Sequence, residues 1–129
     1  MALTEFDALQ SYARMMNTLN PQPFEEILAD DFVYESQHVL QPMKSKNEFM
    51  NYIVPKLQTV ARANATVFAE MGNVSVCGTN RPCVILAQND KSNLLVLVLA
   101  KVEGNKLKRI DLCIVPSPHE AERSGEYPH

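Results

Sequence analysis

The segment 24–36 constrains the fold most, because its pattern changes from that of a helix to that of a strand within a few residues. Its first apolar residues, up to Leu28, recur at helical spacing. After two aspartates the side chains alternate with a period of two. The alternation places Tyr34 and Ser36 on one face of a strand that follows directly on a helix. Tyr34 and Ser36 are therefore expected to point toward the side of the sheet that the preceding helices cover.

The other patterns predict helices in the first half of the chain and a strand meander in the second. The capping residues Thr4 and Ser45 begin the first and third helices, and Pro23 suits the first turn of the second. Pro55 lies inside the third helix, where proline removes a backbone hydrogen bond, so a kink or break is expected over 51–55. Strands are expected from residue 32 and over 66–71 (ending in a turn at 72–73), 83–88, 94–102 and 107–115. This order indicates an α+β fold with helices on one face of an antiparallel sheet.

The strand at 94–102 is apolar on both faces over residues 94–100. A sheet with one face in water alternates apolar and polar residues, and this strand does not. The predicted helices cover one face and no further helix remains for the other. A second copy of the chain, stacked sheet on sheet, is the simplest cover, so a homodimer is expected.

The length of 129 residues predicts one domain, over 1–115, followed by a polar tail over 116–129. The tail is rich in Pro, Glu, Ser and Gly and is expected to fray. A net charge of -3 without a long basic run argues against nucleic acid as a partner. The longest apolar run is too short for a membrane helix, and no secretory signal is visible, so a cytoplasmic protein is expected.

The chain contains neither a glycine-rich phosphate loop nor a spacing typical of metal ligands, so no cofactor and no metal is expected. Three cysteines, Cys77, Cys83 and Cys113, are predicted to be reduced and structural. A bridge between Cys77 and Cys83 under oxidising conditions is the alternative, because the two flank a predicted turn.

The order of elements, Ala-Asp-Asp-Phe-Val-Tyr-Glu-Ser at residues 29–36 and Ser-Lys-Asn-Glu-Phe at 45–49 resemble the nuclear transport factor 2-like superfamily. This superfamily includes ketosteroid isomerases and SnoaL-like polyketide cyclases, and the resemblance spans residues 4–115. It implies a cystatin-like cone, in which a curved, mostly antiparallel sheet wraps around three N-terminal helices and leaves a pocket open at one end.

The resemblance also identifies positions of the isomerase machinery. Tyr12 resembles the tyrosine that stabilises the enolate oxygen. Ser36 stands where the isomerases carry their aspartate base, and Leu99 stands near the position of the second oxyanion donor. A serine cannot act as the carboxylate base and a leucine cannot donate a hydrogen bond. The resemblance therefore implies the fold and a pocket but leaves the activity open.

Tyr12, Tyr34, Ser36 and His38 are predicted to line one shared cavity as ligand-binding residues. His38 is a candidate base, because its usual pKa suits proton transfer, and Tyr12 is a candidate electrophilic donor. The plainer interpretations are a core tyrosine and a histidine at the rim. Arg109 and Asp111 are expected on the second face of the sheet.

Three functions remain open from the sequence. The first is a homodimer that binds a small apolar organic molecule. The second is an isomerase, dehydratase or cyclase that uses acid–base chemistry in the same pocket. The third is a module for dimerisation or protein interaction. Polar groups converging in one pocket would favour the second, and a pocket filled by Met and Phe would favour the third.

Overall fold

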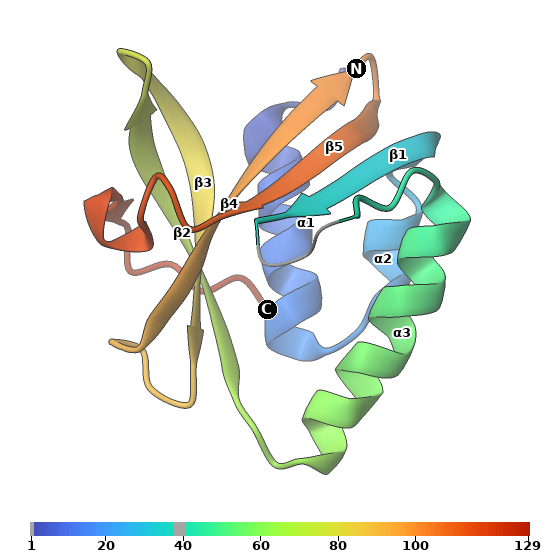
Figure 1. The fold of residues 1–129 in the computed structure, drawn as a ribbon, viewed down its shortest axis with the longest axis horizontal. Helices are drawn as coiled ribbons and strands as arrows, with labels where there is room; N and C mark the ends of the chain where they lie inside the picture. Colours follow the sequence, from blue (N-terminus) through green and yellow to red (C-terminus); the bar gives the residue numbers. More distant parts are fainter. Residues whose placement is uncertain (1, 38–40) are drawn as a thin grey trace.

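Three helices precede a strand meander in the computed structural model, which describes residues 2–37 and 41–129 (Figure 1). The elements are α1 (Glu5–Thr18), α2 (Gln22–Glu25), β1 (Leu28–Ser36), α3 (Lys46–Arg62), β2 (Val67–Val76), β3 (Thr79–Gln88), β4 (Leu94–Glu103), β5 (Lys106–Cys113), a 3-10 turn η1 (Pro118–Glu120) and β6 (Glu122–Arg123). The strands form one sheet in the order β1-β5-β4-β3-β2-β6. Among the described strands, β1 and β5 are the one pair that runs parallel. The predicted α+β class and the curved, mostly antiparallel sheet are confirmed.

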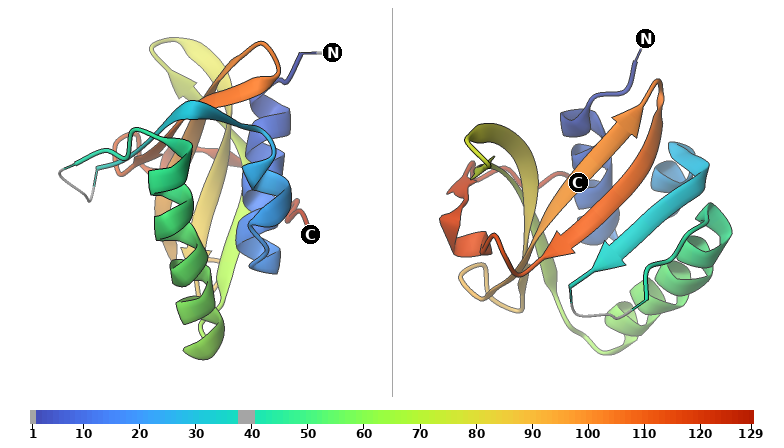
Figure 2. Two further views of the ribbon diagram at one scale, coloured as in Figure 1. Left: turned by 90° about the vertical axis from the view of Figure 1, so that its right-hand side faces the viewer. Right: turned by 45° about the horizontal axis from the view of Figure 1, so that its top comes forward.

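The helices lie on the inner face of the curved sheet (Figure 2). Aromatic side chains fill the space between α2, α3 and β1, where the Phe49 ring packs against the rings of Phe24, Phe32 and Tyr34 at centroid distances of 5.9, 5.1 and 5.0 Å. The inward residues of β1 are thus those that the period-two pattern selected. Burial of these rings against the sheet is the main contribution to a core of this kind.

Both predicted helix starts are confirmed. Thr4 and Asp7 form a reciprocal capping box, and the Ser45 hydroxyl accepts a hydrogen bond from the Glu48 amide. Of the kink or break expected over 51–55, the break is wrong, because α3 continues through Pro55. Pro55 faces solvent, while Phe49, Ile53 and Leu57 on the opposite side are buried against the sheet. This packing outweighs the loss of one backbone hydrogen bond.

The turn expected at residues 72–73 is also wrong, since β2 runs on to Val76 and the hairpin turns at Cys77 and Gly78 with φ of 51° and 79°. Gly72 lies inside the strand for a different reason. A Cβ atom there would lie 2.6 Å from the backbone oxygen of Glu122, so the missing side chain lets the C-terminal segment approach β2.

The outer face of the sheet carries a second apolar cluster, separate from the main core. Its buried members are Val74, Cys83, Ile85, Leu97, Leu99 and Cys113. The C-terminal segment covers part of this face: Ala121 packs against the cluster, η1 lies against β4, and Pro118 is buried. Residues 96–100 of β4 are thus buried within one chain, whereas Leu95 remains 43% exposed.

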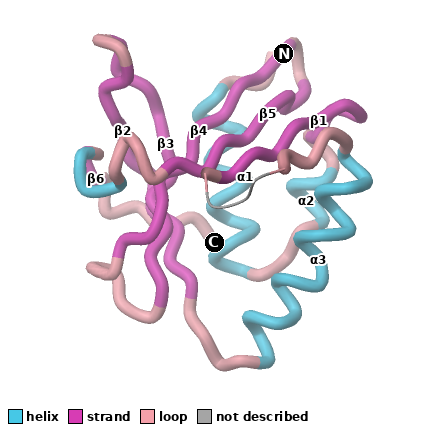
Figure 3. Tube along the Cα trace, in the orientation of Figure 1, coloured by secondary structure: helices cyan, strands magenta, loops and turns pink. Residues whose placement is uncertain are grey.

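Residues 117–129 form a strap around the β2 edge of the sheet, which differs from the frayed tail that the composition predicts (Figure 3). The Arg123 guanidinium binds the buried Glu70 carboxylate at 2.7 Å, and the Gly125 amide donates to the same carboxylate at 2.8 Å. Asn17 on α1 donates to the Pro128 carbonyl at 2.7 Å. These partners lie far away in the sequence, so composition alone gave no sign of them.

Candidate functional site

A cavity of about 420 Å³ opens between α3 and the inner face of the sheet. Most of its wall is apolar and includes Met16, Val60, Val67, Leu86, Val96 and Leu112. Polar atoms come from a smaller set of residues, namely Tyr34, Ser36, Tyr52, Lys56 and Gln88. An apolar hollow with a few polar groups is the usual form of a small-molecule site.

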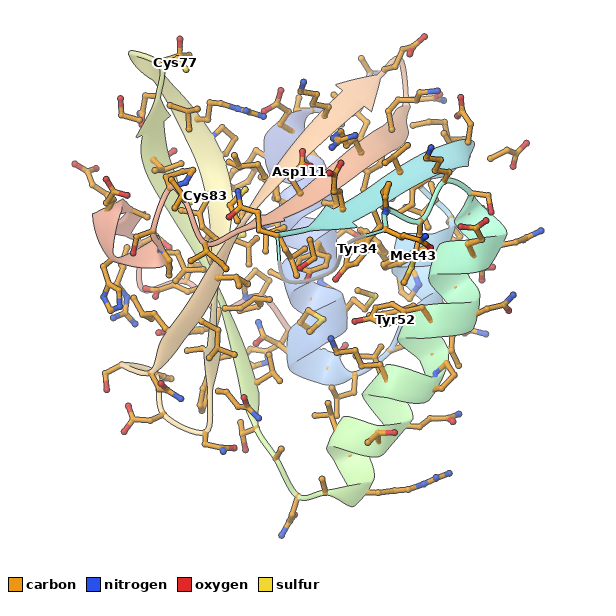
Figure 4. All side chains as sticks on the ribbon, in the orientation of Figure 1. Tyr34, Met43, Tyr52, Cys77, Cys83 and Asp111 are labelled. Carbon is orange, nitrogen blue, oxygen red and sulfur yellow. The ribbon has the colours of Figure 1, made fainter. Side chains whose placement is uncertain are left out.

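Tyr52 and Lys56 form the polar corner of the cavity together with Tyr34. Tyr52 and Lys56 lie one turn apart on α3, and the Lys56 ammonium donates to the Tyr52 hydroxyl at 2.6 Å. The rings of Tyr34 and Tyr52 approach to a centroid distance of 5.7 Å. Figure 4 shows Tyr34 from β1 and Tyr52 from α3 in the space between the sheet and the helix. Two consecutive elements, β1 and α3, thus bring their tyrosines together beside Lys56.

Burial keeps the phenols of Tyr34 and Tyr12 protonated. Burial foremost, then the nearby hydroxyls of Tyr12 and Tyr52 and a hydrogen bond with Tyr52, raise the pKa of Tyr34 far above its ordinary value. Burial and the neighbouring Tyr52 likewise raise the pKa of Tyr12. Both groups are therefore hydrogen-bond donors throughout the physiological pH range, and neither acts as a phenolate base.

Two of the four residues predicted to share a cavity are found among its lining residues. Tyr34 and Ser36 line it. Tyr12 is 2% exposed, packs edge-on against Phe24 and is not among the lining residues. His38 lies outside the described residues. Leu99 belongs to the outer face, so the isomerase-like donor position does not point into the cavity at all.

Tyr52 and Lys56 were missed by the sequence reasoning. Their spacing of four residues places both on one side of α3, which is a detectable signal. This spacing does not identify a binding site on its own, because many exposed helix faces contain such pairs. Only the packing of α3 against β1 turns this pair toward Tyr34.

A smaller hollow of about 260 Å³ lies on the outer face. Here the Arg109 guanidinium is held between two carboxylates, since it donates to Asp111 at 3.0 Å and forms a close ion pair with Glu35. Gln37, which also lines this hollow, binds the backbone of Ile114 and Val115. The placement of Arg109 and Asp111 on the second face follows the predicted alternation.

The three cysteines are unpaired in the structure. Cys77 is exposed in the β2–β3 turn, whereas Cys83 is buried opposite Gly72 in the strand register (Figure 4). Five residues separate them, and the four at 79–82 are extended in β3, which places the two thiols too far apart for a disulfide, so the alternative of a Cys77–Cys83 bridge is excluded. Burial raises the pKa of the Cys83 thiol to about 12, which keeps it unreactive.

Comparison with solved structures identifies the architecture. An NTF2-like protein from Cytophaga hutchinsonii has 13% identity and a TM-score of 0.59, covering 90% of this chain and 96% of that one. The chain has the nuclear transport factor 2-like fold. A polyketide cyclase of Sinorhizobium meliloti, so named only provisionally, has 12% identity and a TM-score of 0.59, with coverage of 83% and 94%.

The same nuclear transport factor 2-like fold occurs in an LEH-like epoxide hydrolase of M. tuberculosis, with 10% identity, a TM-score of 0.58 and coverage of 86% and 84%. At such identities the likeness concerns the fold and not the chemistry. No protein-family model and no curated protein matches the sequence. Among the described residues, no helix combines the length and the apolar character needed to span a membrane.

Proposed function

We propose that this nuclear transport factor 2-like chain binds a small, mostly apolar organic molecule in the cavity between α3 and the sheet. The observation that carries the proposal is the mostly apolar wall of a cavity of about 420 Å³, in which Tyr34, Tyr52 and Lys56 form one polar group. This volume suits a compact ligand in the lower part of the usual range for small-molecule sites. We also propose a cytoplasmic location, which the unpaired thiols support.

N-phenylnaphthylamine, an uncharged apolar dye, tests this proposal. The dye should bind with 1:1 stoichiometry, and its emission should rise and shift to the blue. Val60→Trp should abolish the change in dye emission, because Val60 lines the cavity and the indole ring would fill it. Gln58→Trp is the matched control, since Gln58 is exposed on the same helix. Equal binding by both variants would show that the dye binds elsewhere.

Acid–base catalysis in the same cavity is the alternative from another class. It depends on His38 as base and Tyr12 as donor. Tyr12 does not line the cavity, and the described lining residues contain neither a histidine nor a carboxylate. Binding is therefore the better-supported function, because a proton transfer needs a base within reach of the ligand.

We also propose a homodimer through the part of the outer face that the strap leaves open. Val115 is 75% exposed and Ile114 41% exposed, beside the hollow that Gln37 lines. The surrounding charges, Glu35, Arg109, Asp111 and Lys101, sum to zero, so two copies brought face to face would not repel strongly.

Light scattering at micromolar concentration tests the dimer and should give about twice 14.5 kDa. Val115→Asp should produce a monomer, because a charge would be buried at the contact. Phe6→Asp is the control, since Phe6 is 45% exposed on α1. A single-chain mass for the unaltered protein would rule out this interface.

A further inference from the structure

We infer that the ligand of this cavity carries one anionic oxygen group, such as a carboxylate, which binds Lys56 and Tyr52 while the apolar remainder fills the cavity. The inference rests on the proposed function and narrows its ligand class. It follows from the charges, the hydrogen-bond directions and the position of the polar corner.

Lys56 is the one charged side chain among the described residues that line the cavity. It is exposed, and its ammonium lies 5.1 Å from the centroid of the Tyr52 ring. No carboxylate among those lining residues neutralises it; its partner is the neutral Tyr52 hydroxyl. An ammonium without a counter-ion beside an apolar hollow favours a ligand with a negative charge.

Lys56 and Tyr52 still have N–H and O–H groups that can donate to a ligand after the hydrogen bond between them is counted. The Lys56 ammonium has three N–H groups, and one of them donates to Tyr52. The Tyr52 hydroxyl accepts this hydrogen bond and still carries an O–H of its own.

The two remaining N–H groups of Lys56 and the O–H of Tyr52 therefore form a set of donors without a charged acceptor. Charge-assisted hydrogen bonds to an oxyanion are shorter and stronger than those to a neutral oxygen. Most of the remaining wall consists of side chains such as Val60, Leu86 and Leu112, which offer no hydrogen bonds, while Ser36 and Gln88 add uncharged polar atoms. A ligand with one anionic group on an apolar body suits this wall, because the anion can bind Lys56 and Tyr52 while the body contacts the apolar side chains.

A matched ligand pair tests the inference, namely naphthylacetate and naphthylacetamide, which have nearly the same shape and differ in charge. Each is used to displace N-phenylnaphthylamine from the full-length protein. We expect the carboxylate to displace the dye at about one-tenth of the concentration that the amide needs. Raising the salt concentration should narrow this gap, because Lys56 is exposed.

Lys56→Met keeps the length of the stem and removes the charge, so it should reduce the tenfold preference to less than about twofold. Arg62→Met is the control, since Arg62 lies exposed near the end of the same helix and does not line the cavity. Tyr52→Phe should weaken the binding of both ligands, because it removes a hydroxyl donor that either ligand can use. It also removes the hydrogen-bond partner of Lys56.

The outcomes separate the two proposals. If the dye binds and the carboxylate has no advantage over the amide, the anion inference is wrong while the binding function stands. A preference that survives in Lys56→Met would equally overturn it. If the dye does not bind at all, the proposed function itself fails.

Discussion

A chain that ends at Pro116 should unfold roughly 10–20 °C below the full-length protein. The deleted strap covers part of the outer cluster that includes Leu97 and Leu99. Exposing on the order of 150 Å² of apolar surface costs about 4 kcal/mol in free energy of unfolding. The deletion also uncovers the edge of β2, where β6 pairs with Gly72 and Asn73, and an open edge promotes association. Thermal unfolding followed by circular dichroism measures the effect.

A single substitution tests the contact of the strap with Glu70 separately from its contact with β4. Arg123→Met removes the ion pair with Glu70 but leaves η1 against β4. Because Arg123 is partly exposed, we expect a smaller loss, about 1 to 2 kcal/mol. The prediction of a structural strap fails if the truncated chain melts within about 3 °C of the full-length protein.

Phe49→Ala should destabilise the protein by about 3–5 kcal/mol in the free energy of unfolding. Phe49 is fully buried, and its ring contacts those of Phe24, Phe32 and Tyr34. Removing the ring leaves a hollow at the point where α3 meets β1, which also holds Tyr52 against Tyr34. Chemical denaturation measures the loss, and weaker dye binding should accompany it.

Phe6→Ala is the matched control, because Phe6 is 45% exposed and should change the stability by less than about 0.5 kcal/mol. Phe49→Leu, which retains more of the volume, should lie between the two. This variant keeps the test informative even where Phe49→Ala does not fold. Equal stabilities for Phe49→Ala and Phe6→Ala would contradict the role assigned to this ring.

Local patterns were sufficient for most of the fold. The helix caps at Thr4 and Ser45 are local hydrogen bonds between residues three apart, and they are found as expected. The inward direction of Tyr34 and Ser36 follows from the period of two alone. The predicted strand boundary was wrong where the reason for a residue lies far away in the sequence. Gly72 was predicted to lie in a turn, but it lies inside β2, where its missing side chain makes room for the strap.

By itself, the sequence determined the α+β class, the order of the elements and the inner face of β1, because periodicity and capping act between neighbouring residues. Only the tertiary structure decided what covers the outer face of β4 and what forms the polar corner of the cavity. Asn17 binds the tail 111 residues away, and Tyr52 meets Tyr34 across the gap between α3 and β1. Such contacts depend on how whole elements pack, and no local spacing encodes them.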